Sequence, residues 1–335
     1  MKILITFILT TLFILTVSFR QENERGYKIM GSTNGFTDST LLYLDDVTDG
    51  SFIHLDSAYI INGKFLFAGS LKSKATKTYI RTKDFSDRFS IWLENSTIYV
   101  TAEKGKFKDA TIKGSKTQDE QKILNAVLSS SKNPKEQEFL YVRNNPQSLI
   151  SASILSVYCS TWGKDTATML YKKFTKEIKS TYYGKKIFEF ITLNKNLKIG
   201  DKYVDFLQQD TKGKTVKLSN FNGKTILLEF WGSWCGPCRE GNPELVKIYN
   251  EFNNKGFEIL GVAAETNKEL WLKAVENDKL RWTNTTDFNG DKNKAALIYG
   301  VSYYPANFLI DRNGIIIAKG LRGEALRTKL HEILK

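Results

Sequence analysis

The sequence predicts an α/β domain at the C-terminal end, with a mixed central sheet flanked by helices, preceded by a β-rich sandwich-like domain and a helical connector. Three observations support this fold class. Short β-type runs separated by turn residues come first, helical periods follow, and strands alternate with helices from residue 197 onward. We therefore expect domains at residues 24–115, 116–195 and 196–335 of this 335-residue chain.

The first 20 residues form a targeting pattern. Lys2 precedes an almost purely apolar run over residues 3–19, and Arg20 follows it. The run lies between the core of an ordinary signal peptide and the roughly 20 residues that span a bilayer, and no A-x-A cleavage pattern follows. We expect residues 1–20 to be a removed signal peptide; a retained N-terminal anchor and a buried first helix are the alternatives. A signal or an anchor would place the rest in the periplasm or cell envelope.

The β-rich segment covers about residues 27–114. Its runs include SFIHLDSAYI, KFLFAG and FSIWLENSTIYVTA, and Asn62-Gly63 separates the first two. Asn-Gly between alternating apolar segments predicts a hairpin turn. Several such strands at regular spacing predict a small sandwich or barrel.

Helical periods occupy the connector, and alternating elements follow it. The connector helices are expected at residues 119–129, 146–162 and 165–190, with Pro134 and Pro146 at helix breaks or starts. In the C-terminal domain we expect a hairpin around 210–213, strands at 225–231, 257–265, 306–311 and 315–320, and helices at 237–252, 268–278, 291–299 and 324–334.

Composition excludes several functional classes. The formal charge of +13 is spread along the chain without a basic block interleaved with aromatics, so no nucleic-acid partner is expected. Three cysteines are too few for a disulfide scaffold, and two histidines give poor support to zinc sites or histidine-dependent triads. No cofactor or metal is expected. Cys159 lies among apolar residues, which favours a small buried side chain over a redox role.

The clearest chemistry lies in Trp234-Cys-Gly-Pro-Cys238, between a buried strand and an amphipathic helix. Cysteines three apart at a helix start share one face, and the first lies near the partial positive charge of the helix N-terminus. That position favours the thiolate, which is the attacking species in disulfide exchange. A structural crosslink over so short a loop would contribute only about 2 kcal/mol. A half zinc site lacks its second ligand pair, and c-type haem attachment needs a histidine where Arg239 stands. We therefore predict a redox-active Cys235–Cys238 pair.

Three segments carry a family resemblance. EFWGSWCGPCR resembles the strand-loop-helix active site of the thioredoxin family, Pro243 matches the proline that kinks its helix, and YYPANFLIDRNG resembles its cis-proline segment. Residues from about 197 to 335 are similar to the exported TlpA/ResA-like thiol-disulfide oxidoreductases within that family, and residues 265–299 resemble the insert of this group. The β-rich segment resembles an N-terminal domain of many exported relatives.

The resemblance implies roles for individual residues. Cys235 would attack the substrate disulfide, Cys238 would resolve the mixed disulfide, and Pro305 would be cis opposite the sulfurs. Four further residues would form the turn or contact the substrate: Trp234, Gly236, Pro237 and Tyr304.

Glu229 is a carboxylate inside a strand that otherwise has a buried pattern. Burial would raise its pKa, so that it could accept and return the Cys238 proton directly or through water. Thioredoxins usually have Asp at this position. In the alternative interpretation, Glu229 faces the sheet edge or pairs with a lysine such as Lys224.

The predicted function is that of an exported thiol-disulfide oxidoreductase that reduces protein disulfides, because Gly-Pro between the cysteines resembles the reducing members. The expected partners are protein disulfides and a dithiol electron donor of the membrane or envelope, with membrane contact only through an N-terminal anchor. Cytochrome maturation is a pathway that the resemblance implies. The alternatives are a thiol peroxidase-like antioxidant enzyme, although the P-x-x-x-T-x-x-C pattern is absent, and an envelope binding protein with an auxiliary redox domain.

Overall fold

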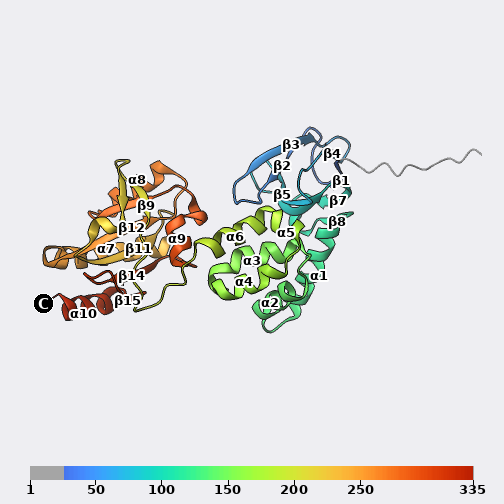
Figure 1. Ribbon diagram of the computed structural model, residues 1–335. Coiled ribbons are helices and arrows are strands. Elements are labelled where there is room, and N and C mark those ends of the chain that lie inside the picture. Colours follow the sequence, from blue (N-terminus) through green and yellow to red (C-terminus); the bar gives the residue numbers. More distant parts are fainter. Residues whose placement is uncertain (1–25, 335) are drawn as a thin grey trace, which may run out of the picture. The chain divides into compact units, whose positions relative to one another are not determined.

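The computed structural model describes residues 26–334, so the predicted signal peptide or anchor lies outside the described residues. The chain divides into two compact units, residues 1–122 and 123–335, and each is described by itself (Figure 1). Within residues 26–334, no helix is both long and apolar enough to cross a membrane. The three domain boundaries stay a prediction.

The first unit contains two four-stranded sheets with the strand orders β4-β1-β7-β8 and β3-β2-β5-β6. Its elements are β1 (Tyr27–Asn34), β2 (Leu41–Asp46), β3 (Ile53–Tyr59), β4 (Lys64–Gly69), β5 (Ala75–Thr82), β6 (Arg88–Glu94), β7 (Thr97–Glu103), the 3-10 helix η1 (Phe107–Asp109) and β8 (Thr111–Lys113). Burial alternates along β1 and β7, as expected for strands with one face in a core. Ile29 and Val100 of the first sheet and Leu44 and Ile91 of the second share one core, which confirms the sandwich-like prediction.

The turn at Asn62-Gly63 forms, but the predicted hairpin does not. Both residues have positive φ, 51° and 68°, as a tight Asn-Gly turn requires. A single bridge joins Ile61 to Lys64, and then β3 pairs with β2 while β4 pairs with β1. The turn therefore passes the chain from one sheet to the other.

Along the chain, six helices follow β8 and precede the strands of the C-terminal sheet: α1 (Lys116–Ser130), α2 (Pro134–Asn144), α3 (Leu149–Trp162), α4 (Lys164–Lys173), α5 (Lys176–Ser180) and α6 (Tyr182–Leu193). The single helix predicted over residues 165–190 is wrong. Thr175 and Thr181 have extended backbones, and their side chains accept hydrogen bonds from Ile178 N and Gly184 N, so each residue caps a new helix. The prediction also missed α2, which begins at Pro134 after the cap Asn133.

The C-terminal sheet has seven strands in the order β10-β9-β13-β12-β11-β14-β15, with β11, β12 and β13 parallel and the other pairs antiparallel. The strands are β9 (Leu207–Asp210), β10 (Thr215–Lys217), β11 (Thr225–Trp231), β12 (Phe257–Ala263), β13 (Thr283–Thr286), β14 (Ala306–Ile310) and β15 (Ile316–Lys319). The helices are α7 (Gly236–Phe252), α8 (Lys268–Asn277), α9 (Lys294–Tyr299) and α10 (Gly323–Ile333), with 3-10 helices η2 (Leu218–Phe221), η3 (Asn253–Lys255) and η4 (Gly290–Lys292). The mixed, thioredoxin-like sheet is confirmed.

Two departures from the predicted elements have local causes. Strand β13 has the sequence TNTT, without the apolar run that predicts a buried strand, and the hydroxyls of Thr285 and Thr286 donate to the carbonyls of Gly261 and Ala263. The helix predicted from residue 291 begins at 294, because Asn293 caps it by accepting from Ala296 N.

Strand β11 separates the two cores of this domain. Leu227 and Trp231 pack with residues of α7, α8 and α10, whereas Ile226, Leu228 and Phe230 pack on the side of α9. Since side chains alternate along a strand, Glu229 lies on the same face as Leu227 and Trp231. The helix that follows β11 covers that face, which is the face where the two cysteines lie.

Candidate functional site

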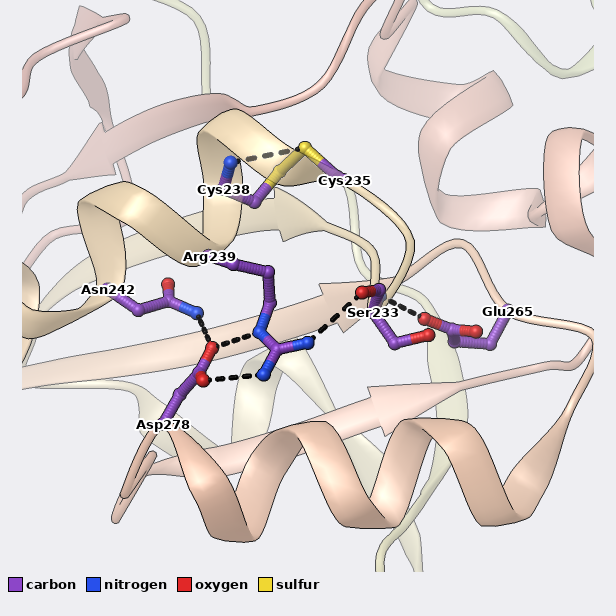
Figure 2. A network of polar contacts seen from close by, with 7 residues as sticks. All are labelled: Ser233, Cys235, Cys238, Arg239, Asn242, Glu265 and Asp278. Carbon is purple, nitrogen blue, oxygen red and sulfur yellow. Dashed lines mark hydrogen bonds and ion pairs between the residues drawn. A yellow bond between two sulfur atoms is a disulfide. The ribbon is translucent and has the colours of Figure 1, made fainter.

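The two cysteines lie where β11 passes through a short loop into α7. Cys235 is the N-cap of α7, and Pro237 stands in the first turn, where its missing N–H costs no helical hydrogen bond. The sulfurs of Cys235 and Cys238 form a disulfide, and the backbone N–H of Cys238 donates to Cys235 Sγ at 3.2 Å (Figure 2). The residues are 4% and 3% exposed. An N–H donor and the helix N-terminus therefore act on the same sulfur.

Trp234 forms the exposed side of the site. The residue is 59% exposed, its Nε1 donates to the carbonyl of Ala264 at 2.8 Å, and its ring meets Tyr304 edge to face with centroids 5.5 Å apart. A Cβ on Gly232 would lie 2.8 Å from the indole, so this close approach requires glycine. A Cβ on Gly236 would meet no atom within 4 Å, so the backbone between the cysteines has open space beside it.

The Tyr304-Pro305 peptide bond is cis, as the resemblance implies. It precedes β14, which pairs antiparallel with β11. Tyr304 packs against the apolar cluster that contains both cysteines, and burial raises the pKa of its hydroxyl. The structure therefore brings the cysteines, Trp234 and the cis-proline segment together.

Glu229 is 5% exposed in the centre of the sheet. Its Oε1 accepts from Arg322 Nη2 at 3.2 Å, while its Oε2 is buried without a hydrogen-bond partner. Burial raises the pKa of Glu229 to about 7, against the opposing effects of the Arg322 guanidinium and of the Asn307 side chain on the neighbouring strand β14. The alternative interpretation is wrong, because β11 is an inner strand and Lys224 pairs with Glu258 instead.

A polar network that the sequence did not predict lies to one side of the two cysteines (Figure 2). Arg239 donates from Nε and Nη2 to the carboxylate of Asp278, and from Nη1 to the carbonyl of Ser233 at 3.2 Å. Asn242 also donates to Asp278, and Glu265 accepts from the N–H of Ser233. Arg239 and Asp278 are 39 residues apart, so no local sequence pattern links them. Within this network, the sequence could have pointed to Glu265, an acidic residue that follows the apolar run of β12.

Cys159 lies on α3, where its side chain is buried and forms no disulfide. Burial raises the pKa of its thiol to about 12, so the thiol stays protonated at neutral pH. Among residues 26–334, no group of three His, Cys, Asp or Glu side chains is arranged to hold a metal ion.

Comparison with known proteins identifies similar proteins for both ends of the chain. The AhpC/TSA family model matches residues 199–319, and a domain of unknown function, DUF4369, matches residues 27–121. The thiol-disulfide oxidoreductase ResA of Bacillus thuringiensis subsp. konkukian (strain 97-27) is 32% identical over 146 residues, which cover 44% of this chain and 82% of that protein. ResA of Bacillus subtilis (strain 168) is 31% identical over 136 residues, covering 40% of this chain and 73% of that protein.

Among solved structures, the thioredoxin domain of a thiol-disulfide oxidoreductase from Bacteroides vulgatus is 35% identical. The match covers 42% of this chain and 99% of that domain, with a TM-score of 0.40.

Proposed function

Because this chain belongs to the family of thiol-disulfide oxidoreductases that includes ResA, we propose that it reduces protein disulfides outside the cytoplasm through the dithiol of Cys235 and Cys238. One observation carries the proposal: the disulfide at the start of α7 with the Cys238 N–H directed at Cys235 Sγ. This donor and the helix end favour negative charge on that sulfur once the disulfide is reduced.

The first step is the attack of the Cys235 thiolate on one sulfur of the substrate disulfide. A bond forms between Cys235 Sγ and that sulfur, the substrate S–S bond breaks, and the other substrate sulfur leaves as a thiolate. The exposed Trp234 and the open space beside Gly236 support access of a polypeptide to this sulfur. Tyr304 and Pro305 offer a backbone edge for the substrate chain beside the disulfide.

The second step is resolution by Cys238. Its sulfur attacks Cys235 Sγ, the mixed disulfide breaks, and the second substrate thiolate leaves, which restores the Cys235–Cys238 disulfide. The Cys238 thiol must lose its proton first, and Glu229 is the proposed acceptor, directly or through water. Its unpartnered Oε2 and its pKa of about 7 support this role, because a base with a pKa near ambient pH both takes and returns a proton.

Two electrons leave the protein in each cycle, so a second dithiol must reduce the disulfide again. We propose a donor in the membrane or envelope and export by residues 1–20, which lie outside the described residues. Cytochrome maturation and antioxidant defence stay predictions about the pathway. Cell fractionation and the mass of the mature chain test export: a chain that keeps residues 1–20 and stays in the cytoplasm contradicts it.

The reductase proposal is tested with purified full-length protein carrying Cys159→Ser, which leaves two titrating thiols. With dithiothreitol as donor, the protein should accelerate the reduction of insulin disulfides, and Cys238→Ser should trap a mixed disulfide at Cys235. The reduction potential should lie near the roughly −270 mV of thioredoxin rather than the roughly −120 mV of DsbA. A value near the second would make the protein an oxidant, and turnover of hydrogen peroxide without insulin reduction would favour the peroxidase alternative.

A further inference from the structure

Two carboxylates of the segment that resembles the insert of exported family members bind residues on both sides of the redox motif, one at a backbone N–H and the other at side chains (Figure 2). Glu265 follows β12 and is 2% exposed, and it accepts from the N–H of Ser233. Asp278 is the C-cap of α8 and accepts two hydrogen bonds from Arg239. Ser233 stands two residues before Cys235, and Arg239 directly follows Cys238.

The side-chain hydrogen bonds to the Asp278 carboxylate come from the first two turns of α7. Arg239 and Asn242 both lie before Pro243, which is inside the helix, and both donate to the Asp278 carboxylate. Pro243 has no N–H, so the carbonyl of Arg239 lacks the helical donor that stands four residues later. The turn that carries Cys238 is therefore bound to the rest of α7 by fewer backbone hydrogen bonds, and Asp278 holds it from the neighbouring helix.

The loop before Cys235 is tied into the same network. Both backbone groups of Ser233 are bound: its N–H donates to Glu265, and its carbonyl accepts from Arg239 Nη1 at 3.2 Å. The guanidinium of Arg239 thus connects the loop before the disulfide to Asp278 through three N–H donors. A planar guanidinium makes such a fork, whereas a lysine ammonium is a point charge on a flexible stem.

We propose that Arg239 and Asp278 are positioning residues for the disulfide exchange: they fix the N–H of Cys238 against Cys235 Sγ, so that this donor stabilises the thiolate. The inference rests on the proposed function for its substrate but concerns the Cys235 thiol itself. The donor is in place at 3.2 Å in the oxidised protein. When the disulfide takes up two electrons, the same N–H faces an anionic sulfur, and its hydrogen bond lowers the pKa of that thiol.

Geometry and charge predict opposite results for one substitution, which makes the proposal testable. Asp278→Asn removes a negative charge and leaves Arg239 without its anion. If the network acted only through charge, the excess positive charge would lower the pKa of the Cys235 thiol. If the network positions the N–H donor, weakening the bidentate contact raises this pKa. Arg239→Lys keeps the charge and removes the fork, so it changes the pKa only through geometry.

The experiment measures the pH dependence of iodoacetamide alkylation of Cys235 in the reduced full-length protein, with Cys159→Ser as background. We expect Asp278→Asn and Arg239→Lys each to raise the Cys235 pKa by about one unit, and to slow its attack on a substrate disulfide about threefold at pH 6, because the smaller thiolate fraction is partly offset by a more nucleophilic thiolate. The double variant should be no worse than the more affected single variant, because both act through one contact.

Matched controls lie in the same domain. Arg327→Lys alters an arginine of α10 that pairs with Glu244 and Glu251, and Glu258→Gln neutralises the partner of Lys224. Both controls should leave the Cys235 pKa unchanged. Circular dichroism of every variant checks folding, and Asn242→Ala weakens the same anchor if Asp278→Asn does not fold.

Three outcomes overturn the proposal. A lower Cys235 pKa in Asp278→Asn with no change in Arg239→Lys would mean that charge alone acts. An unchanged pKa in both variants, with a lowered melting temperature, would mean that the network is structural only. An equal rise in the controls would mean a general loss of stability. Failure of the wild-type protein to reduce insulin would count against the proposed function alone, since alkylation of Cys235 needs no substrate.

Discussion

The β-rich unit and the redox domain each bury a carboxylate in an inner strand, and they treat it differently. Asp45 on β2 is 1% exposed; its Oδ2 accepts from Arg81 Nε at 2.5 Å, and its Oδ1 lies 3.2 Å from His54 Nδ1. On β11, Oε1 of Glu229 accepts from Arg322, and Oε2 has no hydrogen-bond partner. Both carboxylates face an arginine, but only the first has a partner for each oxygen.

The proposed proton-transfer role of Glu229 rests on this difference. The Arg81 guanidinium lies 4.6 Å from the ring centroid of Tyr43 and 4.1 Å from that of Phe85, so rings and carboxylate together fix it. A buried oxygen without a partner costs free energy, and proteins tolerate such a cost mostly at sites that use it. The unpartnered Oε2 of Glu229 lies on the face of β11 that α7 covers.

The largest expected effect tests whether chemistry belongs to the redox domain alone. Cys235→Ser should lower insulin reduction by about 1000-fold or more, because a serine hydroxyl does not form the mixed disulfide. Asp45→Asn should leave the rate within about twofold, since it changes only an ion pair in the other unit. The rate of insulin precipitation measures the activity of both variants. A large loss of activity in a folded Asp45→Asn variant would contradict the assignment of the chemistry to the redox domain alone.

The second prediction concerns stability. Replacing Glu229 by Gln should raise the free energy of unfolding above about pH 7, whereas replacing Asp45 by Asn should lower it. The pKa of Glu229 in the folded protein, about 7, is above its ordinary value of 4.5. Its stabilising contribution is therefore complete below about pH 4.5 and is lost as pH rises through about 7. Glu229→Gln, neutral at every pH, should exceed the wild type by up to about 3 kcal/mol at pH 8 and match it at pH 4. Asp45→Asn should lose about 3 kcal/mol at pH 7, because Arg81 then lacks its anion.

Urea unfolding at pH 4, 6 and 8 checks these signs, with the transitions of the two units fitted separately. A Glu229→Gln variant that is less stable than the wild type at pH 8 would show that the pair with Arg322 outweighs burial. In that case Glu229 would resemble Asp45, and the comparison would fail.

The third prediction is kinetic. Glu229→Gln should slow the resolution of a mixed disulfide about 100-fold at pH 8, because Cys238 loses its proton acceptor. In the wild type, this step should accelerate as pH rises through about 7, where Glu229 becomes an anion, and Glu229→Gln should abolish that rise. Glu229→Asp should restore part of the rate. Single-turnover release of a thiol from a mixed disulfide at Cys235 is the measurement; an unchanged pH profile in Glu229→Gln would exclude the proton-transfer role.

Local sequence patterns predicted the features that depend on neighbouring residues. The disulfide of Cys235 and Cys238, the mixed sheet and the cis bond at Pro305 all follow from contiguous segments or their resemblance to a family. The helix breaks at Thr175 and Thr181 were missed, because an amphipathic pattern continues through a residue that caps a new helix.

Long-range polar partners could not be predicted. Arg322 is 93 residues from Glu229, and Asp278 is 39 residues from Arg239. An arginine or aspartate at a helix end has many surface partners compatible with its sequence, and only the packing of α8 and α10 on β11 selects these. The sequence thus predicted the cysteine pair that forms the disulfide, but not the polar side chains that bind around it.

The smallest expected effect compares exposed aromatics of the two units. Trp234→Ala should raise the KM for insulin about tenfold, and Trp234→Phe about threefold, because the phenylalanine keeps a ring beside Tyr304 but loses the hydrogen bond to Ala264. The kcat should change little in either variant, since the proposed role of the ring is contact with the substrate rather than with the exchanging sulfurs. Tyr99→Ala is the matched control in the β-rich unit, where Tyr99 is 55% exposed on β7. Initial rates over a range of insulin concentrations separate KM from kcat. A KM that rises in Tyr99→Ala as much as in Trp234→Ala would mean that the β-rich unit also captures substrate, and a binding role would then have to be assigned to both units.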